Sequence, residues 1–244
     1  MTEHPRETTL PRRIGFIGLG VMAYPMAGHL ARAGNAATVS TRTAGKARAW
    51  IGEYGGREAA SPAEAARDAD LVFVCVGNDD DLRSVVLDTD GALAGMTTGA
   101  TLVDHTTASA SLARELHAIA AERGLHFVDA PVSGGQSGAV NGTLTVMCGG
   151  DEAVIDATRP VIGAYARAVT WVGPAGSGQL AKMVNQICIA GLLQGLSEGI
   201  AFGEKAGLDM ATVLDVISQG AAQSWQLDNR GKTMLAGQFD FGFA

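Results

Sequence analysis

Over the first two thirds of the chain, short runs of consecutive apolar residues alternate with longer stretches of helical periodicity. The short runs predict buried strands, and the amphipathic stretches between them predict covering helices. Strands are expected at residues 13–17, 37–41, 70–77, 101–104, 125–129 and 168–172, and helices at 22–33, 82–87, 111–123 and 151–166. This alternation is typical of an α/β fold with a doubly wound parallel sheet.

A second region, after a glycine-rich hinge, is predicted to be entirely helical. The hinge at residues 173–178 gives an α/β domain at residues 13–174 and a helical domain at residues 175–244. Residues 1–12 are polar, contain two prolines and lack the apolar core of a signal peptide, so we expect a disordered lead-in.

The helical region opens with a long segment, residues 176–206. Leu180, Met183, Val184 and Ile187 recur at the spacing of one helix face. Almost every later position up to Glu198 is apolar or glycine, so we expect a helix that is buried on most sides.

Lys182, Asn185 and Gln186 are three and four residues apart in this segment, so their side chains project together from another face. A lysine at the entrance of a buried helix must find a partner, reach water or change its pKa. Lys182 is therefore a candidate for chemistry. The alternative is a lysine whose stem is buried while its ammonium group reaches water at the helix end.

A glycine-rich turn follows the first predicted strand and directly precedes a helix. Gly18 permits a tight turn, Gly20 lets backbone N–H groups approach a pyrophosphate, and Ala23 takes a third position that tolerates alanine. Because strand, turn and helix follow in the order that this motif requires, the pattern predicts a Rossmann-type dinucleotide-binding domain rather than an incidental turn.

The end of the second predicted strand indicates which dinucleotide is bound. An NAD site usually has Asp or Glu about 20 residues after the glycines, where it bonds the ribose hydroxyl groups. The sequence instead has Thr41, Arg42, Thr43 and Lys46, and no carboxylate before Glu53. Arg42 and its neighbours offer charge and donors to a 2′-phosphate, so NADP(H) is favoured over NAD(H). The alternative is a loop of solvated charges.

Polar residues also follow the later strands. Asn78 and the three aspartates after it are expected to begin a helix rather than to bind a metal, because they lack a spaced partner. His105 is a weaker candidate, for a proton donor at a strand's carboxyl end. Ser133, Gly134 and Gly135 expose backbone N–H groups suited to a carboxylate, although a simple loop of turn residues has the same composition.

Composition excludes several classes of protein. The 244 residues carry a net charge of −7 and are 18% charged, which is typical of a globular protein and disfavours a nucleic-acid or anionic-membrane surface. No apolar run reaches the roughly 18 residues of a membrane span without interruption. We therefore expect a cytoplasmic protein with no nucleic-acid or membrane partner.

Four separated motifs together resemble the β-hydroxyacid dehydrogenase family, which includes 3-hydroxyisobutyrate dehydrogenase, tartronate semialdehyde reductase, and the glyoxylate and succinic semialdehyde reductases. The motifs are Gly15-Phe-Ile-Gly-Leu-Gly-Val-Met22, Asp104-His-Thr-Thr107, Asp129-Ala-Pro-Val-Ser-Gly-Gly135 continuing to Gly142-Thr-Leu, and Gly176-Ser-Gly-Gln-Leu-Ala-Lys182 with Asn185 and Gln186. They cover most of residues 13–207, and their combination is far more specific than any one of them.

This resemblance implies reversible NAD(P)-dependent conversion between a small carboxylate-bearing β-hydroxy acid and its semialdehyde, with Lys182 as the general acid and base. The substrate contacts that it implies are Ser133, Gly134, Gly135, Asn185 and Gln186. The implied cofactor contacts are Gly18, Leu19, Gly20, Val21, Met22, Thr41, Arg42, Thr43, Lys46, Val76, Gly77 and Thr107. Related imine reductases typically lack the lysine. An imine or ketone reductase and a non-catalytic cofactor-binding interaction module are the alternatives.

Two features of the helical region add to this picture. Family members continue into further helices beyond the residues that resemble positions 239–244, so the resemblance implies a C-terminal domain that is truncated. Gly191, Gly195, Gly199 and Gly203 form one ridge four residues apart, and each glycine inside a helix costs about 1 kcal/mol relative to alanine. We therefore expect a face that another helix approaches closely, either within the domain or across a dimer. We favour the second, in a homo-dimer or homo-tetramer.

Overall fold

The computed structural model describes residues 12–43 and 45–240, and divides the chain into two compact units, residues 1–182 and 183–244. The expected lead-in falls outside the described residues, except for Arg12.

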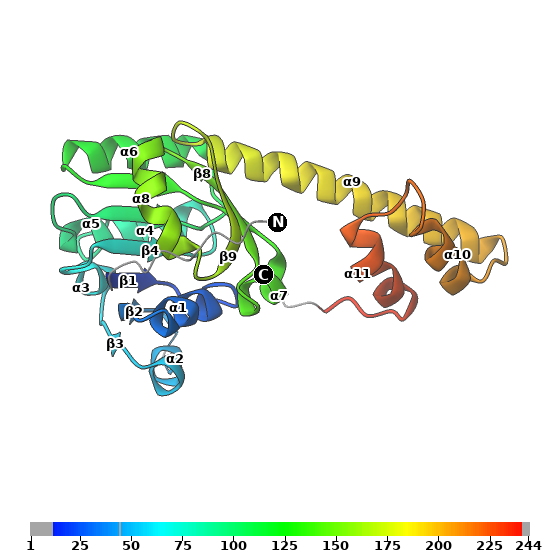
Figure 1. The fold of residues 1–244 in the computed structure, drawn as a ribbon, viewed down its shortest axis with the longest axis horizontal. Helices are drawn as coiled ribbons and strands as arrows, with labels where there is room; N and C mark the ends of the chain where they lie inside the picture. Colours follow the sequence, from blue (N-terminus) through cyan, green and yellow to red (C-terminus); the bar gives the residue numbers. More distant parts are fainter. Residues whose placement is uncertain (1–11, 44, 241–244) are drawn as a thin grey trace, which may run out of the picture. The chain divides into compact units, whose positions relative to one another are not determined.

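The first unit alternates strands and helices around one sheet (Figure 1). Its strands are β1 Arg13–Ile17, β2 Ala36–Ser40, β3 Arg57–Glu58, β4 Leu71–Val74, β5 Thr101–Asp104, β6 His126–Asp129, β7 Val132–Ser133, β8 Leu144–Gly149 and β9 Ala166–Gly173. Its helices are α1 Ala23–Arg32, α2 Lys46–Tyr54, α3 Pro62–Ala66, α4 Asp79–Leu87, α5 Ala92–Gly95, α6 Ala110–Glu122, α7 Gly135–Val140 and α8 Glu152–Ile162. Helix α9, Ser177–Lys205, begins in this unit.

The sheet has the strand order of a doubly wound fold, which confirms the predicted class. Strands β3, β2, β1, β4, β5 and β6 lie side by side in that order and run parallel. Strand β8 pairs antiparallel with β6 and β7, and parallel with β9. The order reverses between β1 and β4, and the carboxyl ends of strands at such a switch point are where open α/β sheets bind ligands.

Both faces of the sheet are covered, as the strand β4 shows. Phe73 packs with Met26 of α1 and Trp50 of α2 in one core, whereas Val72 and Val74 belong to a second core on the other face. All four residues of β4 are buried. A parallel strand covered on both faces has no polar alternation, which is why the sequence shows a continuous apolar run there.

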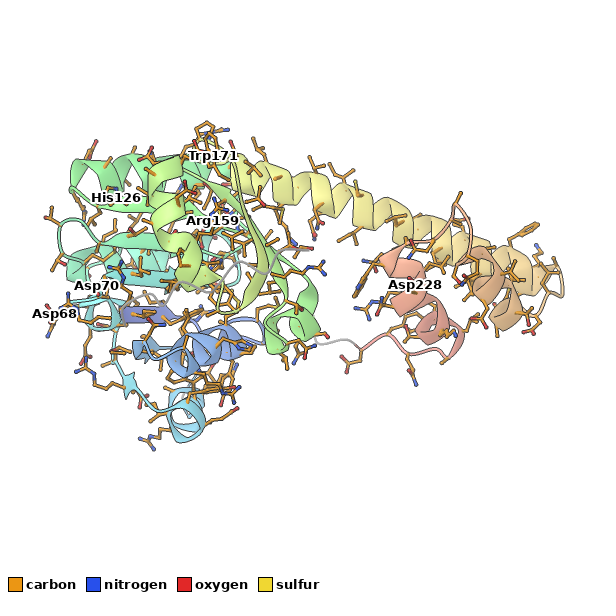
Figure 2. The ribbon with its side chains drawn as sticks, viewed as in Figure 1. Asp68, Asp70, His126, Arg159, Trp171 and Asp228 are labelled. Atoms are coloured by element: carbon orange, nitrogen blue, oxygen red, sulfur yellow. The ribbon has the colours of Figure 1, made fainter. Side chains whose placement is uncertain are left out.

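Hydrogen bonds fasten the last strand of the sheet. Arg159 of α8 donates to the carbonyl oxygen of Val169 in β9, and Trp171 Nε1 donates to the carbonyl oxygen of Gly150 at 3.0 Å. Figure 2 labels Arg159 and Trp171. These bonds fix β9 to α8 and to the end of β8 just before the chain enters α9.

The second unit contains the rest of α9 together with α10, Met210–Ile217, and α11, Trp225–Leu235. Ile200, Met210 and Leu214 form its small core. Asp209 and Ser224 cap the two shorter helices by accepting hydrogen bonds from backbone N–H groups. The expected helical C-terminal region is therefore confirmed, and it is short. None of the helices in the described part of the chain is long and apolar enough to cross a membrane.

The long helix is less buried than its composition predicted. Val184 is 62% exposed and Ile187 is 72% exposed. Among the described residues, nothing lies within 4 Å of the position that a Cβ would take at Gly195, whereas Gly203 lies against Met210 of α10. The prediction of burial on most sides is wrong for residues 183–199, because α10 and α11 pack around the last turns of α9 only.

Candidate active site

The glycine-rich turn lies between β1 and α1, at the switch point of the sheet. Gly18 has a φ of +92°, and a Cβ there would collide with the carbonyl oxygen of Cys75. Nothing in the described chain lies within 4 Å of a Cβ built on Gly20. Helix α1 has no side-chain cap and no acidic residue in its first turn, so its N–H groups and its dipole are available to an anion. The turn is therefore compatible with the pyrophosphate site predicted at Gly18 and Gly20.

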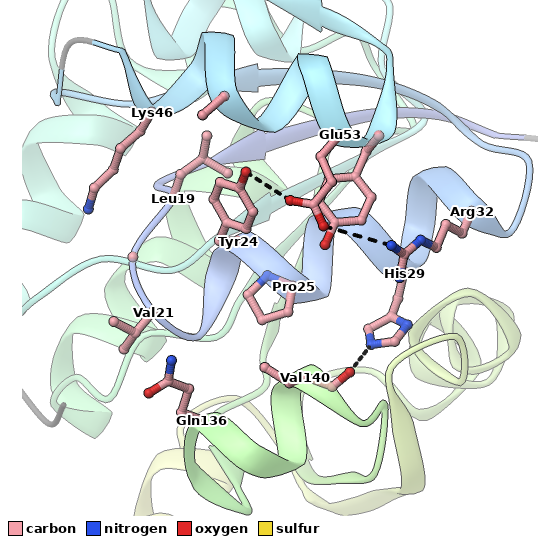
Figure 3. A pocket seen from close by; sticks show the side chains of 13 residues that line it. Leu19, Val21, Tyr24, Pro25, His29, Arg32, Lys46, Glu53, Gln136 and Val140 are labelled. Carbon is pink, nitrogen blue, oxygen red and sulfur yellow. Dashed lines mark hydrogen bonds and ion pairs between the residues drawn. The ribbon is translucent and has the colours of Figure 1, made fainter. Parts of the chain in front are cut away.

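A cavity of about 600 Å³ begins at this turn and follows the outer side of α1 (Figure 3). Its lining includes four predicted cofactor residues, Leu19, Gly20, Val21 and Lys46. Sequence reasoning missed the rest of the lining, which includes Tyr24, Arg32, Glu53 and Gln136. The Tyr24 hydroxyl donates to Glu53 at 3.2 Å, and Arg32 lies 3.8 Å from the same carboxylate. These polar contacts join α1 to α2 where the two helices line the cavity.

Arg42, just after β2, forms an ion pair with Asp81 of α4. The Nη1–Oδ1 distance is 2.6 Å and the Nη2–Oδ2 distance is 3.4 Å. Asp81 also lies beside Gly77, where an added Cβ would be 2.7 Å from Oδ2. The sequence offered no carboxylate near Arg42 before Glu53, so Asp81 is a charged neighbour that sequence reasoning missed. The expected helix start is confirmed, because Asn78 Oδ1 accepts from the Asp81 N–H at 2.9 Å.

The loops after β4 and β5 are joined by hydrogen bonds. The N–H of Val76 donates to Thr106 Oγ1 at 3.1 Å, and the N–H of Thr106 donates to Asp104 Oδ1 at 2.9 Å. Thr107, the next residue, is exposed, as is Gly77. The structure therefore brings the loops that contain the predicted cofactor residues Val76, Gly77 and Thr107 to one edge of the sheet.

His105, by contrast, is buried and fully hydrogen-bonded. Its Nδ1 lies 2.6 Å from the carbonyl oxygen of Ala130, and its Nε2 lies 2.8 Å from the hydroxyl oxygen of Tyr165. Burial lowers the pKa of His105 to about 4. In the neutral ring the Nδ1–H is already donated to the carbonyl oxygen and Nε2 accepts from the hydroxyl, so neither nitrogen can give a proton to a substrate, which argues against His105 as the proton donor.

Helix α9 is fastened to the sheet by the buried carboxylate of Asp129, at the end of β6. Its Oδ1 accepts from the N–H of Gly176 at 2.8 Å, and its Oδ2 accepts from the N–H of Gln179 at 2.9 Å. A Cβ on Gly149 would lie 2.5 Å from Oδ1, so glycine is required for this approach. Burial raises the pKa of Asp129, while the backbone hydrogen bonds act in the opposite direction.

The Gln179 side chain ties the same turn of α9 to the loop after β5. Its Oε1 accepts from the N–H of Ala108 at 3.1 Å, and its Nε2 donates to the carbonyl oxygen of Thr106 at 2.7 Å. These two bonds flank Thr107, and Lys182 lies one helical turn beyond Gln179. The first turns of α9 therefore take their position from a loop predicted to contact the cofactor.

Lys182 itself is buried, with 9% of its surface exposed. Within the described part of the chain its side chain has no hydrogen bond or ion pair, and burial lowers its pKa. An ammonium group with a lowered pKa exchanges protons more readily near neutral pH. Asn185 and Gln186 follow in the second unit, where Asn185 Nδ2 donates to Gln186 Oε1 at 3.1 Å.

The remaining predicted residues form the turn between β7 and α7. Ser133 ends β7, and Gly134 and Gly135 have φ values of 130° and 62°. A side chain would be strained at both glycines. Successive N–H groups in such a turn can face one anion, which is compatible with the predicted carboxylate site.

Asp104 gives the folded state a pH dependence that can be tested. Burial raises its pKa to about 7, and within the described residues its buried Oδ2 has no hydrogen-bond partner. The folded state therefore favours the protonated carboxyl. This contribution to stability is complete below the unfolded pKa and is lost as the pH rises through about 7.

We expect the free energy of unfolding to fall by on the order of 2 kcal/mol between pH 5 and pH 8 relative to Asp104→Asn, which mimics the protonated form. Urea unfolding at both pH values measures the difference, with Asp80→Asn as an exposed control. Parallel pH dependences for the wild type and Asp104→Asn would show that Asp104 does not titrate in this range.

Comparisons with known proteins find matches over nearly the whole chain. A family model described as the NAD binding domain of 6-phosphogluconate dehydrogenase matches residues 13–173. A second, described as NAD-binding of NADP-dependent 3-hydroxyisobutyrate dehydrogenase, matches residues 176–244. The chain is 60% identical over 232 residues to an uncharacterized oxidoreductase of Shewanella frigidimarina, which covers 95% of this chain and 80% of that protein.

Two further relatives have descriptive names. The chain is 34% identical to 2-hydroxy-3-oxopropionate reductase of Escherichia coli, over 95% of this chain and 78% of that one. The solved structure of Mycobacterium tuberculosis 3-hydroxyisobutyrate dehydrogenase with L-serine superimposes with a TM-score of 0.82 at 33% identity, covering 91% of this chain and 75% of that chain. By their names, these two relatives are a reductase of 2-hydroxy-3-oxopropionate and a dehydrogenase of 3-hydroxyisobutyrate.

Proposed function

The chain belongs to the NAD(P)-dependent β-hydroxyacid dehydrogenase family, and from this premise we propose that it interconverts a small β-hydroxy acid and its semialdehyde, using NADP(H). The observation that carries the proposal is the environment of Lys182. This lysine is buried, it has no charged partner among the described residues, and burial lowers its pKa. Its helical turn adjoins Gln179, which is bonded to the loop that contains Thr107. The three cysteines of the chain are free thiols, which supports a cytoplasmic location, where conditions are reducing.

In the proposed reaction a bound NADPH would supply the hydride for the carbonyl carbon of the semialdehyde. Lys182 acts at the carbonyl oxygen: its ammonium group donates a proton there while the carbon–oxygen π bond breaks, and water then restores the proton. In the oxidative direction the neutral amine removes the hydroxyl proton. Ser133, Gly134 and Gly135 receive the substrate carboxylate, and Asn185 and Gln186 orient the substrate or the lysine.

The proposed cofactor site uses the turn and loops at the switch point. Residues 18–22 would hold the pyrophosphate at the start of α1, and Val76, Gly77 and Thr107 would contact the rest of the dinucleotide. Arg42, with Thr41, Thr43 and Lys46, would bind the 2′-phosphate of NADP(H). The support is the charge of Arg42 and Lys46, the exposure of both side chains, and the open space at Gly20.

The direct test is NADPH oxidation by the purified chain with glyoxylate and with three- and four-carbon semialdehydes. Propanal, which lacks a carboxylate, is the control substrate. We expect oxidation with the carboxylate-bearing aldehydes and little with propanal. Turnover of a cyclic imine but of no aldehyde would indicate an imine reductase instead, and NADPH binding without turnover of either would indicate a non-catalytic module.

We also propose that the chain forms a homo-dimer or homo-tetramer through the exposed part of α9. Its support is the exposed apolar pair Val184 and Ile187, together with the open ridge at Gly191, Gly195 and Gly199. A glycine ridge lets a second helix backbone approach closely, whereas it only destabilises an isolated helix.

Gly195→Leu is therefore expected to dissociate the assembly, because the leucine would hold the helices apart. Sedimentation velocity measures this, and the control is Asn229→Leu, which introduces the same side chain at an exposed position of α11. An unchanged sedimentation coefficient and an unchanged Tm for Gly195→Leu would remove this face from the interface.

A further inference from the structure

The ion pair between Arg42 and Asp81 bears on how the chain distinguishes its two possible dinucleotides. We propose that Asp81 is a specificity-determining residue, whose carboxylate binds Arg42 in the cofactor-free protein and competes for it with the 2′-phosphate of NADP(H). This inference rests on the proposed function, because it assumes that Arg42 meets the ribose of the dinucleotide.

The geometry shows which partner of the pair is fixed. The Asp81 side chain is 21% exposed and that of Arg42 is 78% exposed. Asp81 lies in the first turn of α4, its N–H is bound by Asn78, and its Oδ2 lies beside Gly77. The carboxylate is thus held by α4, and the arginine side chain reaches over to it.

The same arginine donors would serve a phosphate. Arg42 directs both terminal nitrogens, Nη1 and Nη2, at the two oxygens of Asp81. This forked arrangement is the one with which arginine binds carboxylates and phosphates alike. A 2′-phosphate must therefore displace Asp81 from Arg42 or share the guanidinium with it, and in either case two negative groups come close together.

The other dinucleotide would experience the opposite effect. The ribose of NAD(H) carries hydroxyl groups, which in dinucleotide-binding folds donate hydrogen bonds to a carboxylate at the end of the second strand. Asp81 would therefore weaken the binding of NADP(H) and support that of NAD(H), although it lies on α4 rather than at the end of β2.

The two neighbouring aspartates do not share this position. Asp79 accepts from the N–H of Ser109 at 2.8 Å and from its hydroxyl at 2.5 Å, so it fastens α4 to the start of α6. Asp80 is exposed and has no ion pair with Arg42. Asp80→Asn is therefore a matched control, with the same change of charge one residue away.

The test is the dissociation constants of NADPH and NADH, measured by fluorescence titration at low ionic strength. We expect Asp81→Asn to raise the affinity for NADPH relative to NADH on the order of fivefold, and Asp80→Asn to change this ratio less than about twofold. The gain should shrink as added salt screens the charges. In the double variant Arg42→Ala/Asp81→Asn, most of the gain should be absent, because it acts through Arg42.

The outcomes separate this inference from the function on which it rests. If Arg42→Ala weakens NADPH selectively while Asp81→Asn behaves like Asp80→Asn, the role of Asp81 is overturned and the NADP(H) assignment stands. If Arg42→Ala leaves the ratio of NADPH to NADH affinity unchanged, the assignment of Arg42 to the 2′-phosphate fails, and the role of Asp81 fails with it.

Discussion

Lys182→Met is expected to lower kcat by about 10²–10⁴-fold while the dissociation constant of NADPH stays within about twofold of the wild type. Methionine keeps the apolar stem of the lysine in its buried site but cannot give or take a proton. The predicted cofactor contacts lie on other elements, so binding should survive. Stopped-flow measurement of NADPH oxidation and fluorescence titration of NADPH check the two parts separately.

The pH profile distinguishes a proton donor from a residue that only packs. Because burial lowers the pKa of Lys182, the reductive rate should fall as the pH rises through that lowered value, since the ammonium form is lost. The oxidative rate should rise over the same range. In Lys182→Met neither rate should show this pH dependence. In Lys205→Met, a substitution at the exposed end of the same helix, both rates should keep it. A wild-type profile in the Lys182→Met enzyme would rule out Lys182 as the acid and base.

Gln179→Leu is expected to lower the free energy of unfolding by about 2–4 kcal/mol, since it leaves the carbonyl of Thr106 and the N–H of Ala108 buried without partners. The kcat should also fall, because the turn that carries Lys182 loses its link to the loop after β5. Urea denaturation measures the stability. Gln194→Leu, an exposed glutamine of the same helix, is the matched control.

A second substitution separates the two bonds of Gln179. Gln179→Glu keeps an oxygen that can accept from Ala108 but places a carboxylate opposite the carbonyl oxygen of Thr106. We expect it to be destabilising at pH 8 and less so at pH 5, where a buried carboxyl is protonated and can donate to that carbonyl. If Gln179→Leu proves no more destabilising than Gln194→Leu, these bonds do not hold the start of α9 in place.

The main strands could be predicted because they are buried on both faces and therefore consist of consecutive apolar residues. The sequence did not predict β3, whose two residues Arg57 and Glu58 are both exposed. It also missed β7 and β8, which lie within a glycine-rich stretch where no periodic pattern is long enough to read. Their place in the sheet comes from pairing with β6 and with each other, and such pairing is not local in the sequence.

The same limit applies to the candidate site. The turn at Gly18 and Gly20 could be predicted, because its geometry depends on adjacent residues. The pairing of Arg42 with Asp81 joins positions 39 residues apart. It depends on the strand order β2-β1-β4, which brings the loops after β2 and β4 to the same edge. From the sequence alone, Asp81 was only part of a helix start.

Amide hydrogens at the start of α9 should exchange more slowly than those in its middle, which is the reverse of the usual order in a helix. The first N–H groups of a helix normally lack partners inside it and exchange quickly with solvent. Here the N–H of Gly176, directly before α9, and the N–H of Gln179, in its first turn, donate to the carboxylate of Asp129, which is itself buried. Deuterium uptake at these two amides would therefore be slower than at Ile187 in the middle of the helix, making them native reporters of whether Asp129 is still in place.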